Sequence, residues 1–270
     1  MTVPLWGVDF TCAPSVRKPS VLAIGTASGA VLRLQGLERL PRMADFEALL
    51  QRPGPWFGAF DFPFGLPRAF VQAQQLGDSA AEVSAELHRR CATRMDFRAL
   101  VDAWGNTQPA GQRLLHRATD GAMPGIRSTS PLQTRYVPVG FMYFEGLSRL
   151  LAAGVQLPAL AEGDGLRVAV EGYPGLLAYQ LIGRRSYKND ASAARLLARK
   201  DIVEALEQGR TNLGLRLKLT PAQAGELVAD ALGDKLDAVL CLMQAAWAHT
   251  RPRHGQPAQV DAVEGWITGT

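Results

Sequence analysis

The stretch that decides the fold is Trp56-Phe57-Gly58-Ala59-Phe60-Asp61-Phe62-Pro63-Phe64-Gly65. Its first five residues form an apolar run of strand length, and Pro63 stops that run because proline cannot continue a sheet ladder. Asp61 is therefore expected at the end of a buried strand. A carboxylate at the edge of a core costs roughly several kcal/mol unless something compensates its charge. A catalytic or metal-binding role supplies such a reason, whereas an aspartate that forms a turn in the core is the alternative.

The same pattern, an apolar run that ends at an acid, occurs twice more. Residues 5–8 (LWGV) precede Asp9, and residues 166–170 (LRVAV) precede Glu171. A turn-capping aspartate and a surface turn glutamate are the alternative interpretations. A further pair, Asp234 and Asp237, begins the very apolar segment GDKLDAVLCLMQAAWA. Residues three apart share one helix face, so this pair is expected to face the interior, although a helix cap at Asp234 also fits.

Working outward from these strands, the pattern predicts an α/β protein. Strand, hairpin, helix and strand signals follow one another over the first 65 residues, with the hairpin turn at 26–29. From 66 to 154 the sequence becomes mainly helical, with a Gly/Pro/Ser/Thr-rich loop before the last helix. A strand at 166–171, two amphipathic helices, the acidic helix and a last short strand at 264–267 complete the series. We expect one domain over 1–270, with a helical insertion at about 66–154.

Composition places the chain among ordinary globular proteins. It has 270 residues, of which 47% are hydrophobic and 20% charged, enough to bury a sizeable core. We find neither a signal peptide nor an apolar run near the roughly 20 residues that span a bilayer, so a cytoplasmic location without a membrane partner is expected. Cys12, Cys91 and Cys241 lie in apolar sequence and are expected to be reduced core thiols. The net charge of +4 is compatible with nucleic acid and equally with simple solubility.

Several carboxylates that converge at strand ends and on one helix favour a divalent metal, because hard oxygen ligands suit Mg²⁺ or Mn²⁺. The chemistry that best uses such a site is two-metal phosphoryl transfer, in which a bound water attacks and no serine or cysteine nucleophile is required. The expected metal ligands are Asp9, Asp61, Asp234 and Asp237. The expected catalytic residues are Asp9, Asp61, Asp237 and Glu171.

Five short motifs resemble the domain of unknown function 429 family, whose members are described as predicted nucleases of ribonuclease-H-like fold. They are GVDFT at 7–11, FDFPFGLP at 60–67, EGYP at 171–174, SYK at 186–188 and GDKLDAVLCLMQA at 233–245. The resemblance covers about residues 5–267. It implies a ribonuclease-H-like mixed sheet flanked by helices, with the helical insertion after the fourth strand.

The resemblance also assigns expected roles. In the wider ribonuclease-H-like superfamily, metal-binding acids lie on the first strand, at the end of the fourth strand and on the C-terminal helix. These places match Asp9, Asp61, and Asp234 with Asp237. Glu171 belongs to the EGYP motif alone and is expected either to be a further ligand or to orient the site.

Two basic residues are expected to bind the substrate. The resemblance places Lys188 near a phosphate, with a solvated loop lysine as the alternative. Arg117, like Arg113, Arg127 and Arg135, is a candidate contact to a phosphate backbone, with helix-surface arginines as the alternative.

The leading hypothesis is thus a nuclease or phosphodiesterase that uses Mg²⁺ or Mn²⁺ and has DNA or RNA as its partner. An actin-like nucleotide phosphotransferase or hydrolase also begins with an acid on strand one. It normally has a Gly-rich phosphate loop next to that acid, and the residues after Asp9, FTCAPSVRK, contain no glycine. A non-catalytic nucleic-acid-binding or scaffolding protein of the same fold, with the acids as turn-formers, is the third hypothesis.

Overall fold

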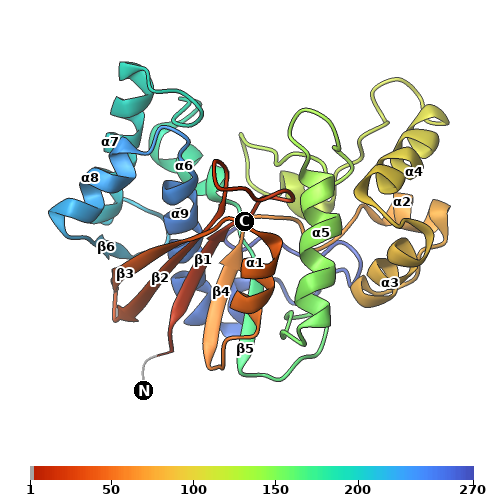
Figure 1. Ribbon diagram of the computed structural model, residues 1–270, viewed down its shortest axis with the longest axis horizontal. Coiled ribbons are helices and arrows are strands. Elements are labelled where there is room, and N and C mark those ends of the chain that lie inside the picture. The colour runs from red at the N-terminus through yellow and green to blue at the C-terminus, as the bar shows by residue number, and fades with distance from the viewer. Residues whose placement is uncertain (1–2) are drawn as a thin grey trace.

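The computed structural model describes residues 3–270, and its centre is a six-stranded mixed sheet flanked by helices (Figure 1). The strand order is β5-β4-β1-β2-β3-β6. β1, β2 and β3 pair antiparallel, whereas β4 runs parallel to β1, β5 to β4 and β6 to β3. The strands are β1 Leu5–Asp9, β2 Ser20–Ser28, β3 Val31–Leu40, β4 Trp56–Phe60, β5 Arg167–Glu171 and β6 Arg216–Lys218. The expected α/β class with a mixed sheet is confirmed.

Helices cover both faces of the sheet. One core packs between the sheet, α1 and the helices of the insertion, and the other between the sheet and α6 to α9. Figure 1 shows the insertion on one side of the molecule and α6, α7 and α8 on the other, with α9 behind the sheet. The α-helices are α1 Met43–Leu50, α2 Arg68–Gln74, α3 Ala80–Arg90, α4 Arg94–Asn106, α5 Val139–Ala152, α6 Pro174–Ile182, α7 Ala193–Glu207, α8 Pro221–Ala229 and α9 Asp234–His249. Two short 3-10 helices, η1 Ala118–Gly121 and η2 Pro252–Gly255, lie in the loops.

The alternation of side chains along the strands decides which face each acid occupies. In β4, Phe57 packs in the core beneath α9 and Phe60 packs in the core on the insertion side. Successive strand residues point to opposite faces, so Asp61 continues the row of Phe57 and points toward α9. Glu171 pairs with Phe60 in the parallel register and therefore shares the insertion-side face. The sheet itself thus separates Glu171 from Asp61.

α9 crosses β1 at the one point where β1 has no side chain. A Cβ atom built on Gly7 would collide with the backbone of Ala238 and Leu242 in α9. Gly7 lies on the same face as Asp9, two residues on, because side chains repeat with period two along a strand. The missing side chain lets the helix axis approach the sheet, and this approach brings the start of α9 to the end of β1.

One local expectation is met, one is wrong, and two elements were not predicted. The three cysteines are buried and free, as expected. The strand expected at 264–267 is instead an isolated bridge between Ile267 and Glu171. Helix α6 and strand β6 are not among the predicted elements, and α6 begins at Pro174, three residues after the strand that ends at Glu171. Among the helices of residues 3–270, none is both long and apolar enough to cross a membrane.

Candidate functional site

Asp9 and Asp61 become neighbours because their strands are parallel and adjacent. The register pairs Val8 with Phe60, so the next residues along, Asp9 and Asp61, stand side by side. The backbone amide of Asp61 donates to the Val8 carbonyl at 2.9 Å and extends the ladder by one step. Neighbouring strands lie about 4.8 Å apart, and at this separation two ionised carboxylates repel each other. The fold therefore places two like charges together at one sheet edge.

Helix α9 adds the third carboxylate. Oxygen atoms of Asp9, Asp61 and Asp237 all lie within 4.8 Å of one another. Asp237 is fully buried, whereas Asp9 and Asp61 are half-buried and open toward solvent. We call these three residues the aspartate triad. It brings together three of the four predicted ligands and has the size to hold a metal ion.

Tyr187 and Lys188 hold the buried member of the triad. The Tyr187 hydroxyl donates to Oδ1 of Asp237 at 2.5 Å, and the Lys188 ammonium pairs with Oδ2 of the same carboxylate. The Lys188 side chain is one-third exposed, so its ammonium is reachable from solvent. Lys188 thus lies beside the triad, and its contact with a phosphate stays a prediction.

The pKa values of Asp9 and Asp61 are raised by burial and by the neighbouring acids. Burial raises the pKa of Asp9 well above its usual range, and Asp234 and Asp61 raise it further. Burial raises the pKa of Asp61 to about 6, an effect that Lys188 opposes and that Glu171 and Asp234 reinforce. Both shifts mean that the folded protein resists full ionisation of its own acids. An added cation would remove that cost.

Asp234 stands next to the triad but outside it. It is the first residue of α9, and the cap of that helix is Gly233, whose φ of 83° favours a residue without a side chain. The interpretation of Asp234 as the capping residue is therefore wrong. Burial raises the pKa of Asp234 and Lys18 lowers it, and Asp234 in turn raises the pKa values of Asp9 and Asp61. It acts on the triad through charge, and its role as a ligand stays a prediction.

Glu171 belongs to a different group of charges. Arg117 donates to both of its carboxylate oxygens, at 2.6 and 2.8 Å, and the Phe64 amide donates at 2.8 Å. The same guanidinium also pairs with Asp120 at 2.9 Å. We call Glu171, Arg117 and Asp120 the buried ion cluster, since each is at least 96% buried. Burial raises the pKa of Glu171, and Arg117 counters this shift.

The ion cluster changes the expected role of Arg117. This arginine was expected to touch a phosphate backbone or to lie on a helix surface, and the structure places it inside the protein at 3% exposure. Its charge is already matched by two carboxylates. Although burial opposes the charge, Glu171 and Asp120 together raise the pKa of Arg117 above its usual value. A direct contact of Arg117 with substrate stays a prediction that the ion cluster disfavours.

A second buried arginine supports the site and was missed from the sequence. Arg199 of α7 is 1% exposed and donates to the backbone oxygens of Tyr187, Asp190 and Val228. It thereby fixes the segment that carries Tyr187 and Lys188. A signal was present, since Arg199 lies three, four and seven residues before the apolar Ile202, Val203 and Leu206 on one helix face.

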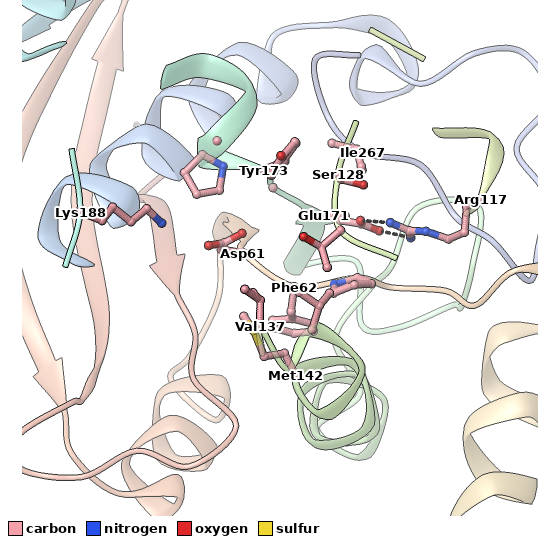
Figure 2. Close-up of a pocket in the computed structure, with 16 residues that line it drawn as sticks. Asp61, Phe62, Arg117, Ser128, Val137, Met142, Glu171, Tyr173, Lys188 and Ile267 are labelled. Atoms are coloured by element: carbon pink, nitrogen blue, oxygen red, sulfur yellow. Dashed lines mark hydrogen bonds and ion pairs between the residues drawn. The ribbon is translucent and has the colours of Figure 1, made fainter. Parts of the chain in front are cut away.

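A pocket of about 290 Å³ opens beside the triad. Figure 2 shows Asp61 and Lys188 at one end of the pocket and Glu171 with Arg117 at the other. Tyr173 lies on the wall opposite Phe62. The pocket reaches both groups of charges because it lies where β4 and β5 end, past the edge of the sheet that separates them.

We found no match for the chain among protein-family models, curated proteins or solved structures. The geometry of the aspartate triad, the ion cluster and the pocket therefore carries the functional argument.

Proposed function

We propose that the protein is a metal-dependent phosphodiesterase that hydrolyses nucleic acid. The observation that supports this most is the aspartate triad, three carboxylates from three separate segments within 4.8 Å of one another. We also propose the ribonuclease-H-like fold, which the family resemblance carried by GVDFT, FDFPFGLP and EGYP implies. A mixed sheet with helices on both faces agrees with that architecture at the level of the layers.

The donor set of the triad fits a divalent cation. All three donors are carboxylate oxygens, the ligand type that Mg²⁺ and Mn²⁺ prefer. Together with Asp234, the triad brings four carboxyl groups. The Lys188 ammonium pairs directly with one of them, Asp237. Asp9, Asp61 and Asp237 would hold the metal, with Asp234 as a further candidate. A bound divalent metal supplies an activated water and neutralises charge on a phosphoryl oxygen.

The chain's own residues account for binding and orientation. Tyr187 and Lys188 fix the Asp237 carboxylate through both of its oxygens. Lys188, one-third exposed, would offer a positive charge to a phosphate that approaches the triad. Lys18 lies close enough to lower the pKa of Asp9 and adds a second positive charge to the approach.

A cleavage assay with matched variants tests this function. The wild-type protein is incubated with single-stranded, double-stranded and branched DNA and RNA in the presence of Mg²⁺ or Mn²⁺. We expect cleavage that EDTA abolishes and that Asp9→Asn and Asp237→Asn each reduce by about 100-fold or more, since removing one group that stabilises transition-state charge typically costs that much. Asp78→Asn, at an exposed acid outside the triad, should cleave as the wild type does.

Metal binding is measured separately by calorimetric titration with Mn²⁺. Binding that disappears in Asp9→Asn, without cleavage of any substrate, would favour a non-catalytic nucleic-acid-binding protein. Cleavage that persists in both triad variants would remove the basis of the proposal.

A further inference from the structure

The pocket beside the triad has two polar ends and two largely apolar walls. Phe62 and Met142 form one wall, and Tyr173 lies across from them (Figure 2). Asp61 and Lys188 line the end next to the triad, and Glu171 lines the far end. An apolar space between two walls, with polar groups at both ends, suits a ring whose edge bears hydrogen-bonding groups.

The size of the pocket limits the ligand to a small one. Its volume of about 290 Å³ lies near the lower end of the range of roughly 300–1,000 Å³ that ligand pockets occupy. One ring system with a short substituent fits such a volume, whereas a large cofactor does not. Asp61 and Lys188 line the pocket, so a substituent at that end would lie beside the triad.

The carboxylate at the far end has acceptor capacity to spare. Among the described residues, Oε1 of Glu171 receives one donor, the Arg117 guanidinium at 2.6 Å. A carboxylate oxygen has two lone pairs, so one position on Oε1 can accept an N–H group from a ligand. Arg117 keeps the carboxylate in place for this contact through two hydrogen bonds.

We propose that this pocket binds a nucleobase adjacent to the phosphate at the triad, with its ring between Tyr173 and Met142 and an N–H group of its edge on Glu171. Proteins that work on a single nucleotide read it in this way, by stacking and by hydrogen bonds to the base edge. The choice of a nucleobase rests on the proposed function. The bound base would come from an unpaired or extruded nucleotide, because a base stacked within a duplex cannot enter a pocket.

Two substitutions at exposed lining positions test the pocket without disturbing the core. Val137, which is 54% exposed, and Thr129, also exposed, both line the pocket. Val137→Trp and Thr129→Trp would each fill it with an indole. Met95→Trp is the matched control, since Met95 is 52% exposed on α4 and does not line this pocket. Circular dichroism and thermal melts check that all three variants fold.

Binding is measured first without metal, so that it does not depend on cleavage. Saturation-transfer NMR in EDTA monitors adenosine. Calorimetry with Mn²⁺ then compares adenosine 5′-monophosphate with ribose 5-phosphate, which lacks the base. We expect adenosine binding by the wild type and Met95→Trp, and a loss of about tenfold for each pocket variant and for ribose 5-phosphate, as one stacked base contributes roughly 1–3 kcal/mol.

The outcomes separate the pocket from the nuclease proposal. Adenosine binding that both pocket variants lose supports the inference even if no nucleic acid is cleaved. An arm with a short single-stranded oligonucleotide distinguishes the source of the base: tighter binding than adenosine 5′-monophosphate identifies a polymer, and equal binding a free nucleotide. Failure of the wild type to bind adenosine and adenosine 5′-monophosphate, or unchanged binding in the two folded pocket variants, would overturn it.

Discussion

Asp61 combines the clearest sequence signal with the clearest electrostatic cost. It follows directly on a buried strand and stands beside Asp9, and its pKa is raised to about 6 by burial and by neighbouring acids. A carboxyl group that binds its proton more tightly in the folded state stabilises the fold at low pH. That contribution is fully present below the ordinary value of 3.8 and is lost as the pH rises through about 6. Without metal, ionised Asp61 is therefore a destabilising residue above that range.

Asp61→Asn should consequently stabilise the metal-free protein at neutral pH. We expect its free energy of unfolding at pH 7.5 in EDTA to exceed that of the wild type by about 1–3 kcal/mol, because one pKa unit corresponds to about 1.4 kcal/mol. The gain should fall toward pH 4, where Asp61 of the wild type is protonated. Urea denaturation at pH 4, 5 and 7.5 measures it. A gain that does not change with pH would contradict the assignment, and Asp78→Asn serves as the control.

At the scale of elements, the site depends on how closely α9 approaches β1. Gly7 removes the side chain that would keep the helix away, and Gly233 begins the helix in a left-handed conformation beside Lys188. The position of Asp237 is thus fixed by two glycines as well as by its own hydrogen bonds. The sequence predicted α9 and its acidic start, but not this contact. A glycine inside a strand pattern signals that something approaches closely, without saying what.

Gly7→Ala should damage both stability and the site. A methyl group there meets the α9 backbone and not a flexible side chain, so we expect a loss of about 3 kcal/mol or more of unfolding free energy. Gly36→Ala in β3 is the matched control, because a Cβ atom at Gly36 meets nothing within 4 Å. Denaturant melts of both variants measure the difference. Equal stability of the two variants would argue against the close approach of α9.

Arg199 makes the corresponding prediction for α7. Arg199→Met removes the three hydrogen bonds that the buried guanidinium donates to backbone carbonyls, and we expect it to lower the free energy of unfolding by about 2–4 kcal/mol. It should also weaken Mn²⁺ binding, since Tyr187 and Lys188 would no longer be held against Asp237. Arg185→Met, which removes an exposed pair with Asp201, should change stability by about 0.5 kcal/mol at most. Calorimetric titration that finds normal Mn²⁺ affinity in Arg199→Met would leave Arg199 a purely structural role.

At the scale of the whole molecule, the sequence predicted strands and acids better than their partners. Apolar runs that end at an acid, and the chain-stopping Pro63, are local signals, so the ends of β1, β4 and β5 were recognisable, and Asp9 and Asp61 with them. Glu171 looked equivalent because it also ends a strand. Its register places it on the opposite face, and register depends on contacts with distant parts of the chain. The partnership of Glu171 with Arg117, 54 residues away, has no local signal at all.

The ion cluster joins the insertion to the sheet, and this connection gives the last prediction. Glu171→Gln keeps the shape of the side chain but removes the charge that faces Arg117. We expect a loss of about 1–3 kcal/mol in unfolding free energy, together with faster amide exchange in residues 107–138.

Mn²⁺ affinity should stay close to that of the wild type, because Asp9, Asp61 and Asp237 lie on the other face of the sheet. A large loss of Mn²⁺ affinity would instead make Glu171 a further ligand, one of the two roles that the resemblance carried by the EGYP motif implies. The control for stability compares the single variant Arg117→Met with the double variant Arg117→Met, Glu171→Leu. The single variant leaves the Glu171 charge buried without its partner, whereas the double variant removes both charges of the pair. The double variant should therefore recover part of the stability that the single variant loses.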